Sequence, residues 1–183
     1  MRSTAEALQA FETTVGRYLI ELDSLDMEQL IKKPNEEEWS IGQMYMHLIQ
    51  SAQFMHLHNV DQCLAGSVAT LDAMEEKTER GKGAFELGSF PPVRIRVPAS
   101  PQYTPKQPES KEQLKESFLG IVERMKNTES TLSTVPESRI NRKILHPGFG
   151  ALNANEWFLL IEMHYRHHLS QLERLKQFLG NNA

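Results

Sequence analysis

The amino-acid sequence predicts an all-α protein built as a four-helix bundle. Apolar residues recur at intervals of three and four along four long segments, which is the spacing of amphipathic helices. Side chains that cap helix starts open several of these segments, and no segment alternates convincingly like a β-strand. The chain has 183 residues, of which 39% are hydrophobic. This is enough for one domain, residues 1–183, with a buried core.

The first two predicted helices lie in the N-terminal third of the chain. The first runs from about Thr4 to Leu25, and its repeating apolar residues are Leu8, Phe11, Val15, Tyr18, Leu19 and Leu22. The second begins near Ser40, because Ser40 and Gln43 are spaced as in a capping box, and it continues to about Leu64. Gly66 then supplies a stop signal.

The last two predicted helices have similar start signals. Ser110 and Gln113 form a second capping box, which opens a helix that continues to about Pro136. The fourth helix opens at Asn153 and closes before Gly180. Within it we expect Glu156 to complete the cap with Asn153, and Trp157 to fill space in the core.

A long irregular crossover, from about residue 66 to residue 109, joins the second and third helices. Its second half, Phe90–Pro101, is rich in proline and cannot sustain a helix. Val93–Val97 alternates like a strand, but the flanking prolines favour an extended crossover, while Ala69–Glu79 can form a short helical turn. The crossover is long enough to span the bundle, so the second and third helices can run parallel.

Composition narrows the cellular setting and the partners. A formal charge of −4 and a pI near 6.0 argue against nucleic acid as the main partner. The single cysteine, Cys63, excludes an internal disulfide and a cysteine-rich zinc site. The first residues lack the apolar core of a signal peptide, and no stretch is apolar enough to span a membrane. We therefore expect a cytoplasmic protein with neither a membrane nor a nucleic acid as partner.

The fourth helix carries imidazoles on its apolar side. On a helical wheel that starts at Trp157, His168 falls inside the apolar face, His164 lies at its edge, and His167 lies on the flank. Histidines four residues apart stand one turn above each other, so both rings can reach one metal ion. A lone buried histidine is usually structural, but a pair pointing inward makes a metal site a serious alternative.

Two histidines leave a metal ion short of ligands, and the second helix offers three more. These are His47, His56 and His58. His47 and His58 share one stripe of the helix, together with Ser51 and Phe54, but they are roughly 16 Å apart along the axis and cannot bind the same ion. Periodicity does not choose among the three. The alternative for each is a solvated or partly buried polar residue.

Three segments resemble one known family. Trp39–Leu48 resembles the second-helix signature of the DinB/YfiT-like four-helix-bundle metalloproteins, in their DinB_2-like branch. His146–Trp157 and His164–Leu172 are similar to a later block of that family, and the proline-rich crossover resembles its YfiT-like members. The resemblance implies an up-down-down-up order of helices. It also implies that one divalent ion, zinc or nickel, is bound by His47, His164 and His168.

The expected metal site suggests an enzyme. Three histidine ligands leave positions open, which is typical of a catalytic ion. Such an ion acidifies bound water or deprotonates a thiol. The resemblance implies three alternatives: an S-transferase using a low-molecular-weight thiol, a hydrolase using water, or a non-catalytic stress-response protein. We expect a metal-dependent enzyme acting on a small-molecule substrate, with thiol transfer favoured over hydrolysis.

Further residues are candidates for contacts with the substrate or with a metal ligand. His146 lies in a His-Pro-Gly-Phe-Gly loop, and the alternative is that it caps the entrance to the fourth helix. Arginine and lysine side chains of the crossover and of the segment before His146 can bind an anionic substrate, unless they are only solvated surface. These are Arg94, Arg96, Arg139, Arg142 and Lys143.

The second helix also suggests self-association. Met55, Leu57 and Val60 point to different sides of the predicted helix, so its apolar surface is wider than one bundle core requires. We expect a homodimer in which this surface pairs with its own copy. The alternative is that the crossover covers it.

Overall fold

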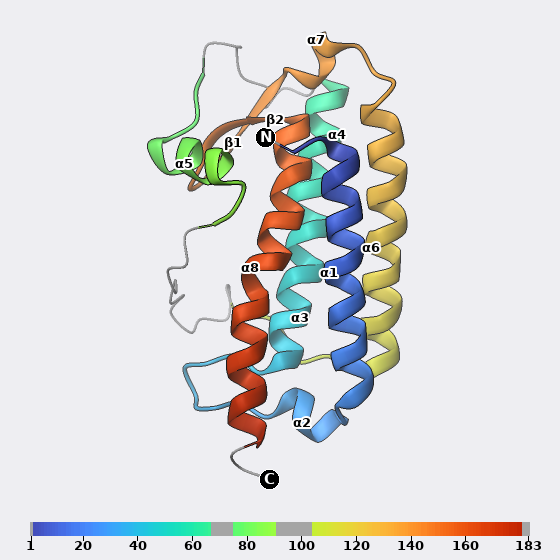
Figure 1. Ribbon diagram of the computed structural model, residues 1–183, viewed down its shortest axis with the longest axis vertical. Helices are drawn as coiled ribbons and strands as arrows, with labels where there is room; N and C mark the ends of the chain where they lie inside the picture. The colour runs from blue at the N-terminus through green and yellow to red at the C-terminus, as the bar shows by residue number, and fades with distance from the viewer. Residues whose placement is uncertain (1, 67–74, 91–103, 181–183) are drawn as a thin grey trace.

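The computed structural model describes residues 2–66, 75–90 and 104–180. Its body consists of four long helical rods that lie side by side (Figure 1). The second rod has three consecutive parts, because a π-helical segment, η1, separates two α-helices. The rods are α1 (Thr4–Ser24), α3–η1–α4 (Ile41–Gln50, Ser51–His56, Leu57–Ala65), α6 (Lys111–Leu132) and α8 (Ala154–Gly180).

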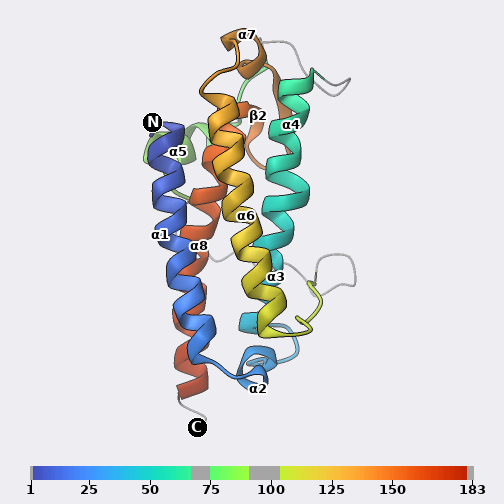
Figure 2. The same cartoon turned by 90° about the vertical axis from the view of Figure 1, so that its right-hand side faces the viewer.

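The order of helix directions is up-down-down-up, as predicted. In Figure 1 the first and last rods, α1 and α8, run from the top of the view to the bottom, whereas α3–α4 and α6 run from bottom to top. The two middle rods are therefore parallel, so the end of α4 and the start of α6 lie at opposite ends of the bundle. Figure 2 shows the same arrangement from the side, with α1 beside α6. α8 packs against both α1 and α4.

The predicted helix starts form through the expected capping contacts. Ser40 Oγ accepts a hydrogen bond from the Gln43 backbone N–H, and the Gln43 side chain accepts one from the Ser40 N–H. Asn153 and Glu156 make the same reciprocal pair at the start of α8. Gly66 ends α4 with a φ of 68°, a left-handed conformation that favours glycine.

Several short elements were not predicted. They are α2 (Met27–Ile31), α5 (Glu79–Leu87), α7 (Glu137–Ile140), β1 (Lys143–His146) and β2 (Gly150–Asn153). The expectation that the chain has no strands was wrong at β1 and β2, which pair antiparallel as a hairpin. Four-residue strands are too short to produce a recognisable alternation. The helical turn that Ala69–Glu79 can form falls largely on residues 67–74, which lie outside the described residues; in the described part, α5 begins at Glu79.

The centre of the bundle is a cluster of aromatic rings contributed by all four rods. Its members are Phe11, Tyr18, Tyr45, Phe118 and Tyr165, and all are fully buried. The Tyr18 hydroxyl donates to the Tyr165 carbonyl at 2.7 Å, which ties α1 to α8. The Tyr18 ring also stacks on Phe118, 5.8 Å between centroids. Because Tyr45 and Tyr165 are close neighbours of His47 and His164 in the chain, their packing sets the direction of those imidazoles.

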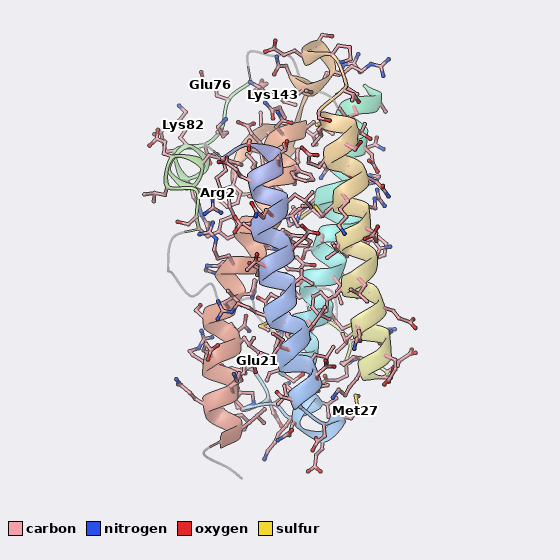
Figure 3. The ribbon with its side chains drawn as sticks, turned by 45° about the vertical axis from the view of Figure 1, so that its right-hand side comes forward. Arg2, Glu21, Met27, Glu76, Lys82 and Lys143 are labelled. Carbon is pink, nitrogen blue, oxygen red and sulfur yellow. The ribbon has the colours of Figure 1, made fainter. Side chains whose placement is uncertain are left out.

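The segment 75–90 is fastened against the hairpin and α8. Lys77 forms an ion pair with the buried Glu156, and the Lys143 ammonium donates to the Glu75 carbonyl at 2.7 Å. Figure 3 shows Glu76, Lys82 and Lys143 gathered at the end of the bundle that also holds Arg2. Charged contacts therefore hold the segment 75–90, which includes the short helix α5, at this end of the bundle.

The apolar surface that suggested a homodimer is largely internal. Leu57 and Val60 are fully buried, and Met55 is partly buried against the core. These residues do not supply an exposed pairing surface, so the homodimer stays a prediction. Among the described residues, no helix is long and apolar enough to cross a membrane.

Candidate metal centre

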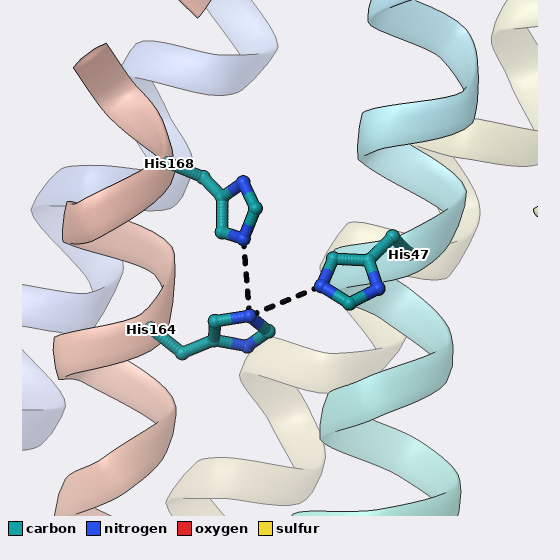
Figure 4. A group of neighbouring side chains, drawn as sticks. All are labelled: His47, His164 and His168. Carbon is teal, nitrogen blue, oxygen red and sulfur yellow. Dashed lines mark hydrogen bonds between the residues drawn. The ribbon is translucent and has the colours of Figure 1, made fainter. Parts of the chain in front are cut away.

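Three imidazoles from two rods converge beside the aromatic core. His47 comes from α3, and His164 and His168 stand one turn apart on α8. The Nε2 atom of His164 lies 3.1 Å from Nε2 of His47 and 3.1 Å from Nε2 of His168 (Figure 4). One nitrogen from each ring lies within 4.8 Å of the others. This grouping can hold a metal ion.

Two of the three rings have a hydrogen-bond partner at Nδ1. His168 Nδ1 lies 2.7 Å from the Gln171 side-chain oxygen, which can only accept, so His168 carries its proton on Nδ1. His47 Nδ1 makes a longer contact, 3.5 Å, with Ser51 Oγ. Both contacts suit rings whose Nε2 atoms carry a free lone pair. A metal-ligating histidine needs this tautomer and commonly has such a partner.

The electrostatics of the site keep its rings neutral. Burial lowers the pKa of His47 to about 4, and burial together with the nearby His47 lowers that of His168 to about 3. Burial and the neighbouring imidazoles hold the pKa of His164 well below its ordinary value. Each neutral imidazole can present one unprotonated nitrogen, so the group suits a divalent transition-metal cation, since metal ligands must be deprotonated.

The π-helical segment changes which side chains of the second rod face α8. In an uninterrupted α-helix, His56 would lie about 180° round the axis from His47. A π-helix contains an extra residue per turn and rotates everything after it by about 100°. His56 is 3% exposed, and its ring centroid lies 5.4 Å from that of His164.

The alternative that treated His56 as solvated or partly buried was therefore wrong, because that residue is fully buried. The same alternative is correct for His58, which is exposed. The helical wheel placed Phe54 on the same stripe as His47, but its side chain is 68% exposed. A single α-helical period cannot describe this rod, and the sequence carries no simple signal for the π-helical insertion.

Aromatic side chains border the three imidazoles. The Trp39 ring lies 5.0 Å from the His47 ring, and the Phe90 ring lies 5.9 Å from that of His164. His167, expected on the flank of α8, is half-buried beside Phe90, 5.5 Å between ring centroids. Aromatic rings therefore lie against both His47 and His164.

His146 stabilises its own turn. Its Nδ1 accepts hydrogen bonds from the backbone N–H groups of Gly148 and Phe149, at 3.0 and 3.2 Å. Its ring stacks on Phe149 and lies 5.2 Å from Trp157. Burial, with a smaller effect of Arg80, lowers the pKa of His146 to about 4. The described contacts of His146 thus link the hairpin to the start of α8.

The basic residues proposed for an anionic substrate are spread through the fold. The Arg142 guanidinium packs on Gly66 and donates to the Leu64 carbonyl at 3.4 Å, so it fastens the end of α4. Arg139 lies in the short helix α7, and Lys143 donates to the Glu75 carbonyl. Arg94 and Arg96 lie outside the described residues. No basic cluster at the imidazoles is seen in the described part of the chain.

Comparisons with known proteins agree with this architecture. The sequence profile of the DinB superfamily matches residues 10–172. The chain belongs to the DinB superfamily. YuaE of Bacillus subtilis, an uncharacterized protein, is 25% identical over 162 residues, which are 86% of this chain and 89% of YuaE.

Among solved structures, that of YfiT from Bacillus subtilis is similar to this one. YfiT is described as a probable metal-dependent hydrolase with an unusual four-helix bundle topology. The two structures match with a TM-score of 0.61 over 97% of this chain and 87% of YfiT. At 16% sequence identity, this likeness shows the fold. The superfamily profile confirms the DinB-like resemblance of the sequence, and the likeness to YfiT confirms the fold.

Proposed function

We propose that this DinB-superfamily protein is a metal-dependent enzyme whose single divalent ion is bound by His47, His164 and His168. The observation that carries the proposal is the convergence of three neutral imidazoles, in which the Nε2 atoms of His47 and His168 each lie 3.1 Å from Nε2 of His164. Structural zinc sites usually have four protein ligands. A site with three, in which no carboxylate of the described residues takes part, leaves positions open for a substrate.

The surrounding residues have distinct roles in this proposal. Gln171 and Ser51 hold His168 and His47 in the tautomer that presents Nε2. Trp39 and Phe90 restrict water, and the lower local polarity strengthens the attraction between charged groups in the site. A divalent ion bound there supplies electrostatic stabilisation to an anionic nucleophile, either hydroxide or thiolate.

Hydrolysis of a small-molecule substrate is the first candidate reaction. YfiT, which shares the fold, is described as a probable metal-dependent hydrolase. Thiol transfer, favoured by the sequence resemblance, is the second candidate, because a site with three neutral ligands retains the full charge of the ion and suits a thiolate equally well. Thiol transfer has less support in one respect, because it needs a binding site for an anionic thiol co-substrate. Arg142 and Lys143, two of the basic residues expected to bind this co-substrate, make contacts with backbone carbonyls.

Cobalt substitution distinguishes the alternatives. The metal-free protein is loaded with one equivalent of Co²⁺ and titrated with low-molecular-weight thiols while the absorption spectrum is followed. A thiolate-to-cobalt charge-transfer band supports thiol transfer. Metal-dependent cleavage of a panel of esters and amides, without such a band, supports hydrolysis. Stoichiometric metal binding with neither result indicates a non-catalytic metal-binding protein, and failure of the wild type to bind a divalent ion overturns the proposal.

A further inference from the structure

One of the three converging imidazoles lacks the support that the other two have. His168 and His47 contact Gln171 and Ser51 through Nδ1. The Nδ1 atom of His164 is buried and has no hydrogen-bond partner within the described residues. If His164 binds a metal through Nε2, its Nδ1 must carry the proton, and a buried N–H donor without an acceptor is unfavourable.

On the second rod, His56 also has a buried ring nitrogen that lacks a hydrogen-bond partner within the described residues. His56 is the last residue of η1, it is 3% exposed, and the nitrogen without a partner is its Nδ1. Its ring stands at 90° to that of His164, with the centroids 5.4 Å apart. Two imidazoles joined by one hydrogen bond have centroids about 5 Å apart, given the usual donor–acceptor distance. The observed separation therefore suits a hydrogen bond between a nitrogen of the His56 ring and His164 Nδ1.

We propose that His56 is the positioning residue for His164: an unprotonated nitrogen of the His56 ring accepts the hydrogen bond that His164 donates from Nδ1. This contact fixes the plane and tautomer of the His164 ring, so that its Nε2 faces His47 and His168. The assignment rests on the proposed function, since it takes His164 as a metal ligand.

The π-helical segment gives this contact its structural basis. Without the extra residue, His56 would lie on the side of the rod away from His47. The six residues of η1 begin with Ser51, which contacts His47, and end with His56, which lies beside His164. π-Helical insertions are frequent at functional sites. Here the insertion places His56 beside His164, the ligand that neither Gln171 nor Ser51 contacts.

A substitution that preserves ring volume tests the proposal. His56→Phe removes both nitrogens and leaves all three ligands in place, so we expect one Co²⁺ to bind with a dissociation constant about 10–100-fold higher. Competition with a chelator measures this constant. His56→Asn, whose side-chain oxygen can accept the hydrogen bond, should recover part of the loss. The matched control is His58→Phe, a change at an exposed position of the same rod, which should leave the affinity unchanged.

The metal-free variants separate positioning from a general structural role. His56→Phe replaces a buried unpaired polar group with an apolar one, so the melting temperature of the metal-free protein should not fall. A lower melting temperature with wild-type affinity for Co²⁺ means that His56 only fills space, and this result overturns the proposal.

The wild-type protein provides a test that needs no variant. In ¹⁵N-histidine-labelled, zinc-loaded protein, a ¹⁵N–¹⁵N coupling across the hydrogen bond should connect His164 Nδ1 with a ring nitrogen of His56. Absence of this coupling, or a doubly protonated His56, contradicts the proposal. The two proposals fail differently: wild type without metal binding overturns the proposed function, whereas wild-type affinity in His56→Phe overturns only the role of His56.

Discussion

His47 and His164 are 117 positions apart in the sequence, yet their Nε2 atoms lie 3.1 Å apart in the fold. The contact joins α3 to α8, two rods that are held together by the buried aromatic cluster. Each ring alone is an ordinary half-buried histidine. Their juxtaposition with His168 is what makes a metal centre the natural interpretation.

Removal of any one of the three imidazoles should abolish stoichiometric metal binding. With His47→Ala, His164→Ala or His168→Ala, two nitrogen ligands remain, too few for a stable site. Metal content after equilibration with Zn²⁺ and gel filtration, measured by mass spectrometry, checks this. His58→Ala is the control, because His58 is exposed on α4. Full metal content in His168→Ala would rule out the assigned ligand set.

Two glycines of α5 should respond in opposite ways to the same change. A Cβ atom on Gly81 would lie 2.2 Å from the Phe149 carbonyl oxygen, whereas a Cβ on Gly83 would meet nothing within 4 Å. Gly81→Ala should therefore separate α5 from the hairpin and speed amide hydrogen exchange there. Gly83→Ala should slow it, because alanine favours a helix interior by about 0.5–1 kcal/mol. Equal protection of the α5 amides from hydrogen exchange in the two variants would show that α5 does not depend on this close packing.

Truncation of the aromatic cluster should lower stability strongly. Phe118 is fully buried between Tyr18, Tyr45 and Tyr165. Phe118→Ala leaves a cavity and should reduce the free energy of unfolding by about 3–5 kcal/mol, measured by urea denaturation. In the control, Phe54→Ala, the side chain is already 68% exposed, and the change should stay within about 0.5 kcal/mol. Similar losses for the two variants would contradict the described core.

Stability of the metal-free protein should fall in mild acid, partly through His146. Burial and Arg80 lower the pKa of His146 to about 4, whereas the unfolded value is about 6.5. Between these values only the unfolded chain binds the proton, so the free energy of unfolding decreases as the pH falls from 6.5 to 4 and is unaffected above 6.5. The slope from this group is at most about 1.4 kcal/mol per pH unit.

His146→Asn isolates this contribution. The asparagine oxygen can accept the N–H groups of Gly148 and Phe149 but does not titrate. Urea unfolding with a chelator present, at pH 5, 6, 7 and 8, should therefore show a smaller dependence on pH in the variant. His47, His56, His164 and His168 also have lowered pKa values, so part of the dependence remains. Parallel curves for the variant and the wild type would exclude a contribution from His146.

The expected homodimer is tested by sedimentation equilibrium at micromolar concentration. A mass near twice 21.0 kDa supports self-association, and a mass near 21.0 kDa means a monomer. In a dimer, Phe54 is a candidate contact, because its exposed ring lies on the second rod, where Leu57 and Val60 are buried. Phe54→Glu should then shift the mass toward the monomer.

The sequence by itself determined the four rods and much of the candidate ligand set. Helix spacing and caps are local properties, so the starts at Ser40 and Asn153 could be predicted from neighbouring residues alone. The period of α8 likewise placed His164 and His168 on its inner side. The choice of His47 came from the family resemblance, because periodicity left His47, His56 and His58 equivalent.

Only the tertiary structure decided what surrounds those ligands. The β1–β2 hairpin and the packing of α5 on Phe149 depend on contacts between segments far apart in the chain, which no local pattern encodes. The position of the His56 ring beside His164 depends on one extra residue in η1. A π-helical turn is unfavourable on local grounds, and it persists where packing between rods compensates for it. For this reason the helical wheel placed Phe54 on one stripe with His47 and did not place His56 beside His164.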